Sequence, residues 1–192
     1  MSTVPKAISN ELNGINLPQL QETIGHIQAQ PALASFRFEF TNRWLNGPRT
    51  HSTIRSFYGA GQTHQHAAAI ELDTDEPPVL LGSDTDANPG ETLMHALAAC
   101  VTSAIVFHAA ARGIAIEKIE STIEGDVDLR GFLGLDESVR NGFEQIRMKL
   151  KIKADVPDAE LQELCDLGPR YSPVYDSVTN GLPVHVSAER MD

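Results

Sequence analysis

The fold is decided by residues 88–113, which read NPGETLMHALAACVTSAIVFHAAARG. Pro89 suits the first turn of a helix, Glu91 is an acid near the positive N-terminal end, and Gly113 is a typical helix terminator. These signals predict a helix over Glu91–Arg112. Nearly every face of this helix is apolar, so we expect a curved sheet or a second subunit to cover it on all sides.

The same helix has nearly the length of a membrane span. Its most apolar part, Leu93–Ala111, is rich in alanine and is interrupted by polar residues, so we interpret it as a buried core helix. The N-terminus, Met1–Asn10, lacks the basic segment and apolar run of a secretory signal. We therefore expect a cytoplasmic protein that has no membrane partner.

The composition of the 192-residue chain is that of an ordinary globular protein, with 41% hydrophobic residues. Its net charge of −11 is expected to lie on the surface, where it repels phosphate backbones. We therefore expect no nucleic-acid partner.

We divide the chain into an N-terminal helical arm, residues 1–35, and a main domain, residues 36–192. In the arm, Asn16 can cap a short helix that has Pro18 in its first turn and ends before Pro31. The apolar residues of this helix share one face, which suits a docking arm.

From Phe36 onward, apolar residues recur at every second position, which is typical of strands. Asn46-Gly47 separates this run from a second one, Thr50–Phe57, and this arrangement predicts a hairpin. We predict a third strand over His66–Leu72 and a loop over Asp73–Pro89.

Acidic residues alternate with apolar ones over Ile119–Leu129, and basic residues do so over Ile146–Lys153. This pattern predicts neighbouring antiparallel strands whose opposite charges pair on the exposed face.

The C-terminal part predicts a helix over Asp158–Leu167 that ends at Gly168, then a short helix capped by Ser172, and a final strand over Val184–Ser187. The predicted fold class is therefore α+β, with the order βββ-α-ββ-α(α)-β.

The two cysteines, Cys100 and Cys165, are too few for a disulfide framework or a zinc site, although a redox pair is possible. His95 and His108 are too far apart on one helix to share a metal ion. His64 and His66 share a strand face, but the sequence nominates no further ligands. We expect no metal and no cofactor.

Three parts of the chain carry a family resemblance: Asn88–Cys100, the run from Ala111–Ile114 to Glu124–Leu129, and Ser172–Val174. Together they resemble the osmotically induced and organic-hydroperoxide-resistance proteins, the OsmC and Ohr proteins. The resemblance implies strongly bent antiparallel sheets wrapped around a long buried central helix. It also implies an intertwined homodimer with two active sites at the subunit interface.

The activity implied by the resemblance is the reduction of organic or inorganic hydroperoxides in oxidative-stress defence. Cys100 would be the peroxide-reacting nucleophile, and a thiol reductant would restore it. An arginine of the early hairpin would favour the thiolate, and among Arg43, Arg37, Arg49 and Arg55 we favour Arg43. A glutamate beside Pro89 would hold that arginine; this sequence has Gly90 at the family's position, and Glu91 follows it.

The chain departs from the family at its second cysteine, where it has Ser172 before Pro173-Val174. Serine cannot form the intramolecular disulfide, so Cys165 or an external thiol would have to resolve oxidised Cys100. An alternative function is a homodimer without peroxidase turnover that binds a small apolar or electrophilic ligand at its interface.

Overall fold

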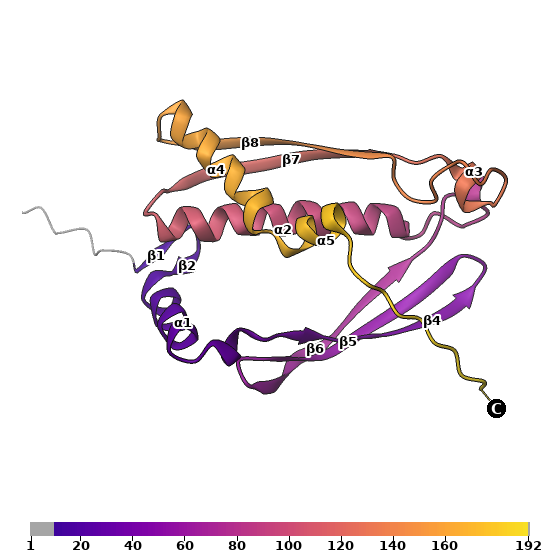
Figure 1. The fold of residues 1–192 in the computed structure, drawn as a ribbon, viewed down its shortest axis with the longest axis horizontal. Helices are drawn as coiled ribbons and strands as arrows, with labels where there is room; N and C mark the ends of the chain where they lie inside the picture. Colours follow the sequence, from indigo (N-terminus) through magenta and orange to yellow (C-terminus); the bar gives the residue numbers. More distant parts are fainter. Residues whose placement is uncertain (1–9, 192) are drawn as a thin grey trace, which may run out of the picture. The chain divides into compact units, whose positions relative to one another are not determined.

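The computed structural model describes residues 10–191, which form helices and antiparallel strands (Figure 1). The described chain divides after His95 into two compact units. The longest helix, α2 (Pro89–Ala111), begins in the first unit and continues into the second. The units are therefore described one at a time.

The first unit opens with a small hairpin and a helix. Strands β1 (Glu11–Leu12) and β2 (Ile15–Asn16) pair antiparallel and lead into α1 (Leu17–Ala29). The Asn16 side chain accepts a hydrogen bond from Gln19 N at 2.9 Å, so it caps α1 as predicted. A short 3₁₀ turn, η1 (Pro31–Ala34), follows.

A four-stranded antiparallel sheet makes up most of the first unit. It contains β3 (Arg37–Phe38), β4 (Thr41–Asn46), β5 (Arg49–Gly59) and β6 (Gln62–Thr74). Strand β5 is central, because β3 and β4 pair along one of its edges and β6 along the other. The hairpin predicted at Asn46-Gly47 is confirmed. The predicted first strand is interrupted between β3 and β4, and the third strand is longer than predicted.

The loop after β6 is organised by Asp75, whose side chain is fully buried. Its carboxylate accepts hydrogen bonds from three backbone N–H groups and one hydroxyl, at 2.8–3.3 Å. The donors are Glu76 N, Ser83 N, Thr85 N and Thr85 Oγ1. A Cβ at Gly82 would collide with the Glu76 backbone, so this tight loop requires glycine there. The loop contains η2 (Pro78–Leu80) and leads to the start of α2.

The second unit is built on the later turns of α2. Strands β7 (Ile116–Asp126) and β8 (Gln145–Ala154) form an antiparallel pair that runs alongside the helix (Figure 1). Their apolar residues pack on the buried face of α2, which consists of Leu97, Val101 and Ile105. The outer face pairs acids with bases as predicted. Glu120 lies opposite Lys151, and Arg147 Nε donates to Glu124 Oε1 at 2.6 Å.

Three shorter helices complete the second unit: α3 (Leu129–Phe132), α4 (Asp158–Tyr171) and α5 (Pro173–Asn180). The prediction that α4 ends at Gly168 was wrong. Gly168 lacks a side chain and packs closely against α2, where a Cβ would lie 2.7 Å from Val101 Cγ1. Here glycine permits close helix packing instead of terminating the helix, which continues through Pro169 to Tyr171.

The predicted final strand, Val184–Ser187, was also wrong. Residues 181–191 form no helix or strand in the described chain, and Val184 and Val186 are 77% and 90% exposed. An extended segment becomes a strand only when a neighbouring strand satisfies its backbone groups. The alternating sequence is present, but among residues 10–191 it has no partner strand.

The side chains of α2 differ in their exposure. Its buried residues are Leu97, Val101, Ile105, Ala109 and Ala110, whereas Leu93 and Phe107 are 40% and 48% exposed. Among residues 10–191 it is the one helix that is long and apolar enough to cross a membrane, by length and composition alone. The α+β fold with antiparallel sheets and a long helix is confirmed.

Replacing Gly168 with alanine should destabilise the protein by about 1–3 kcal/mol, because the new methyl group overpacks the contact with Val101. Urea unfolding would measure this. The matched control is Gly25→Ala on α1, where a Cβ meets nothing within 4 Å and should add about 1 kcal/mol of helix stability. Equal stability of Gly168→Ala and the wild type would contradict the close packing.

Asp75→Asn should be less stable than the wild type at neutral pH, because an amide group would face donors that now meet a carboxylate. Burial alone would raise the pKa of Asp75, but the four hydrogen bonds together lower it below the ordinary value of 3.8. The wild-type advantage is therefore complete above about pH 5 and is lost as the pH falls from there through the lowered pKa.

Thermal unfolding across this pH range would measure the Asp75 effect. Asp84→Asn is the control, because Asp84 is exposed and its left-handed backbone, φ 58°, suits asparagine. A constant difference between wild type and Asp75→Asn down to the lowest pH would contradict the proposed ionised, hydrogen-bonded carboxylate.

Candidate functional site

Cys100 lies near the middle of α2 and is a free, half-buried thiol. The next residue, Val101, is buried in the contact with the sheet, while Ala96 and Ser103, one turn away on either side, are exposed. Cys100 therefore lies at the border between the packed face and the open face of the helix. The backbone of Cys100 is therefore held by the packed face, while the residue itself remains partly exposed.

Cys165 lies on α4 and is also free and half-buried. Burial raises the pKa of its thiol, and the neighbouring carboxylate of Asp166 raises it further. Both influences favour the protonated form, which is a poor nucleophile.

The packing of α4 shows where Cys165 lies along α2. Leu164 belongs to a buried cluster with Ala109 and Ile114, whereas Gly168 meets Val101 and Ile105. Helix α4 therefore runs antiparallel to α2, and Cys165 lies between these two contacts, beside the Ile105–Ala109 turn of α2. That turn lies about 8–14 Å along the helix axis from Cys100, whereas a disulfide needs Cα atoms within about 7 Å. The register of α4 thus places Cys165 beside a later turn of α2 than the turn that carries Cys100.

Ser172 is 2% exposed and caps α5. Its Oγ accepts a hydrogen bond from Tyr175 N at 3.1 Å, as the sequence predicted for an N-cap. Gly168, one turn earlier, contacts Val101, and Val174 packs on the same face of α2. Ser172 therefore belongs to the segment that lies beside the Cys100 region of the helix.

Glu91 forms a capping box at the start of α2. Its backbone N–H donates to Asn88 Oδ1 at 2.8 Å, and its Oε2 accepts from Asn88 N at 2.9 Å. The carboxylate is thus directed at the first turn of its own helix. Within residues 10–191 it makes no ion pair with an arginine of the hairpin.

The arginines of the hairpin differ in their surroundings. Arg43 is exposed on β4 opposite His51, and it forms no ion pair in the described chain. Arg49 has a buried Nε without a hydrogen-bond partner. Arg37 lies over the Tyr58 ring, 5.9 Å from its centroid. Arg43 and Arg49 therefore have guanidinium N–H groups available to an anionic group.

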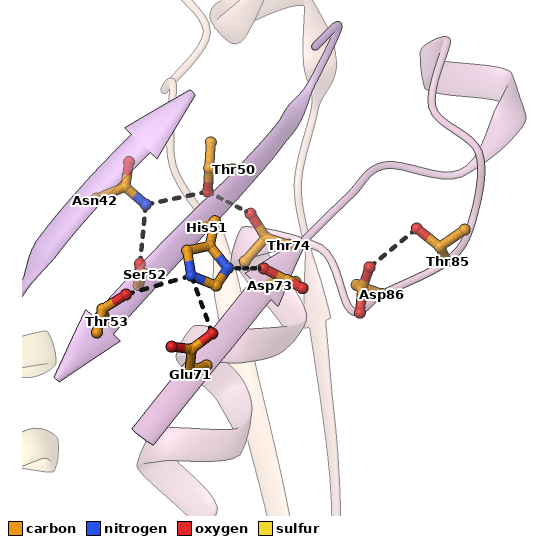
Figure 2. Close-up of polar contacts among 10 residues, drawn as sticks. All are labelled: Asn42, Thr50, His51, Ser52, Thr53, Glu71, Asp73, Thr74, Thr85 and Asp86. Atoms are coloured by element: carbon orange, nitrogen blue, oxygen red, sulfur yellow. Dashed lines mark hydrogen bonds and ion pairs between the residues drawn. The ribbon is translucent and has the colours of Figure 1, made fainter. Parts of the chain in front are cut away.

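A polar network beside Arg43 was not predicted from the sequence. Figure 2 shows His51 with its two ring nitrogens directed at two carboxylates of β6. Nδ1 lies 2.6 Å from Asp73 Oδ1, and Nε2 lies 3.2 Å from Glu71 Oε2. In the sequence, the sign of this network is that Glu71 and Asp73 stand two positions apart on one strand face. This sign points to His51 only when the register of β5 against β6 is known.

The described residues contain no group of three or more His, Cys, Asp or Glu side chains placed to bind one ion. The two carboxylates near His51 hold the imidazole in place between β5 and β6. The candidate site residues offer a thiol at Cys100, a guanidinium at Arg43 and a carboxylate at Glu91.

A comparison with protein families matches residues 82–187 to the OsmC-like protein family. The match covers more than half of the chain and includes Glu91, Cys100 and Cys165, but not Arg43. No curated protein matches the chain.

Solved structures share the fold at low sequence identity. An OsmC-like protein from Mycoplasma pneumoniae is 16% identical with a TM-score of 0.57, over 76% of this chain and 89% of that one. A putative osmotic stress induced and detoxification response protein from Psychrobacter arcticus is 15% identical. Its TM-score is 0.54, over 72% of this chain and 85% of that one. An organic hydroperoxide resistance protein OsmC from Legionella pneumophila is 19% identical. Its TM-score is 0.52, over 74% of this chain and 90% of that one.

These similarities confirm the fold, and the family match agrees with the motif around Cys100 that the sequence suggested. The chain belongs to the OsmC-like protein family.

Proposed function

We propose that this protein reduces organic or inorganic hydroperoxides, with Cys100 as the nucleophile. The observation that supports this most directly is the free, half-buried thiol at the border of the packed face of α2, inside the segment matched to the family. One structural relative is described as an organic hydroperoxide resistance protein, which agrees with this reaction class.

The reaction starts with attack of the Cys100 thiolate on a peroxide oxygen. The O–O bond breaks, the sulfur becomes a sulfenic acid, and the leaving oxygen takes up a proton to give an alcohol or water. Cys100 lies beyond the first turn of α2, so the helix dipole does little to favour its thiolate. A positive side chain has to supply that effect.

We propose Arg43 as this cation, because its guanidinium has no carboxylate partner in the described chain. Arg49 is the second candidate, because its buried Nε–H has no acceptor. A buried donor without an acceptor destabilises the fold unless another group accepts its hydrogen bond. Glu91 uses one carboxylate oxygen in the capping box, which leaves the other oxygen free to orient an arginine.

We also propose that the protein acts as a homodimer in the cytoplasm. The open face of α2 exposes Leu93 and Phe107, and the sheet of the first unit exposes Trp44 at 70% and Leu72 at 49%. Such exposed apolar side chains are typical of surfaces covered by a second subunit. Neither nucleic acid nor a membrane is a proposed partner.

A second candidate function is binding of a small apolar or electrophilic molecule without peroxidase turnover. Two features favour it: Ser172 stands where the resemblance puts the family's second cysteine, and Cys165 lies beside a later turn of α2 than Cys100. A reactive but slowly recycled thiol would suit an electrophile-binding protein.

Purified reduced protein should consume an organic hydroperoxide when dithiothreitol is supplied, and Cys100→Ser should abolish this activity. Cys165→Ser should retain it, which controls for the loss of a thiol. The measurement is peroxide remaining over time, for an organic hydroperoxide and for hydrogen peroxide. If wild type and Cys100→Ser are equally inert, the peroxidase proposal fails and the binding function takes its place.

In a Cys165→Ser background, Arg43→Gln should slow alkylation of Cys100 by iodoacetamide at neutral pH on the order of tenfold, because less thiolate is present. Arg130→Gln is the control, since Arg130 is committed to Asp128, with Nε 2.9 Å from Oδ2. If Arg49→Gln slows the alkylation of Cys100 and Arg43→Gln does not, then Arg49, and not Arg43, is the cation that favours the thiolate.

A further inference from the structure

The position of Cys165 constrains how an oxidised Cys100 can return to the thiol. Helix α4 packs on α2 through Leu164, Leu167 and Gly168, which are all buried. Cys165 follows Leu164 and is therefore turned by about 100° around the helix from that contact. It is thus displaced from Cys100 both along the helix axis and around it.

The reactivity of Cys165 points in the same direction. A resolving cysteine attacks as a thiolate, and burial together with Asp166 raises the pKa of the Cys165 thiol. Two independent features, its position and its protonation, therefore disfavour Cys165 as the resolving group.

The segment that does lie beside the Cys100 region offers no thiol. Gly168 and Val174 both contact the Leu97–Ile105 face of α2, and Ser172 lies between them in the chain. Its hydroxyl oxygen is occupied by Tyr175 N and is shielded from solvent. A hydroxyl cannot form a disulfide, so nothing from this segment can resolve Cys100.

We propose that Cys100 works as a single-cysteine centre, whose sulfenic acid is resolved by an external low-molecular-weight thiol. This inference rests on the proposed peroxidase function and adds the second substrate. The external thiolate attacks the Cys100 sulfur, the S–O bond breaks, and water leaves as a mixed disulfide forms. A second thiol then attacks the external sulfur, releases the Cys100 thiol and leaves as a small disulfide.

The experiment treats reduced wild type and Cys165→Ser with one equivalent of organic hydroperoxide, first without thiol and then with 2-mercaptoethanol. Intact-mass and peptide analysis would follow both cysteines. We expect a dimedone-reactive sulfenic acid at Cys100, an unmodified Cys165, and then a mixed disulfide between Cys100 and 2-mercaptoethanol. Cys165→Ser should give the same products.

A disulfide that joins Cys100 to Cys165, within one chain or between two, would overturn the inference while leaving the peroxidase proposal intact. Absence of any oxidation at Cys100 would instead overturn the peroxidase proposal itself. The two failures are therefore distinguishable by mass.

The matched variant is Ser172→Cys, which places a thiol in the segment beside Cys100. On hydroperoxide treatment without added thiol, we expect an intramolecular disulfide between Cys100 and the introduced thiol. This result would support the placement of Ser172 and show that the assay detects internal resolution. Persistence of the Cys100 sulfenic acid in Ser172→Cys would contradict that placement and overturn the structural basis of the inference.

Discussion

The second unit depends on the close approach of Gly168 to Val101 and Ile105. With no side chain at this point, α4 can pack against α2, and Leu164 then enters the cluster formed by Ala109 and Ile114. This contact fixes the register between the two helices. The register in turn decides which residues of the C-terminal segment lie near Cys100 and which lie beside later turns of α2.

The same contact explains why α4 continues past glycine and proline. Pro169 lacks a backbone N–H, but the buried residues on either side of it, Leu167, Gly168 and Ser172, stabilise the helical path. The chain then turns at Ser172, whose side chain satisfies an N–H of α5. The hydroxyl at this position has a structural role of its own, which would typically contribute about 1 kcal/mol.

Local patterns in the sequence predicted several elements correctly. Helix α2, the hairpin at Asn46-Gly47 and the charge pairing of β7 with β8 all belong to this group. The final strand failed because the alternation of Val184 and Val186 specifies an extended conformation but not a partner. The end of α4 failed because the meaning of Gly168 depends on what it packs against.

In the candidate site, too, some features follow from local sequence and others depend on contacts between residues far apart in the chain. The motif identified Cys100, Glu91 and the unusual Ser172 directly from the sequence. The bonds of His51 to Asp73 and Glu71 depend on a register that joins residues about twenty positions apart. The distance of Cys165 from Cys100 depends on the antiparallel packing of α4, which no local pattern specifies.

The border position of Cys100 links the fold to the chemistry. On the packed face of α2 a thiol would be inert, because peroxide and reductant could not reach it. On a fully exposed face it would meet every thiol and oxidant in solution without selection. At the border, its backbone is fixed by Val101 in the core, while Ala96 and Ser103, one turn away on either side, are exposed. Under the proposed mechanism, a thiol at this border needs no second cysteine in its own chain, because an external thiol takes that role.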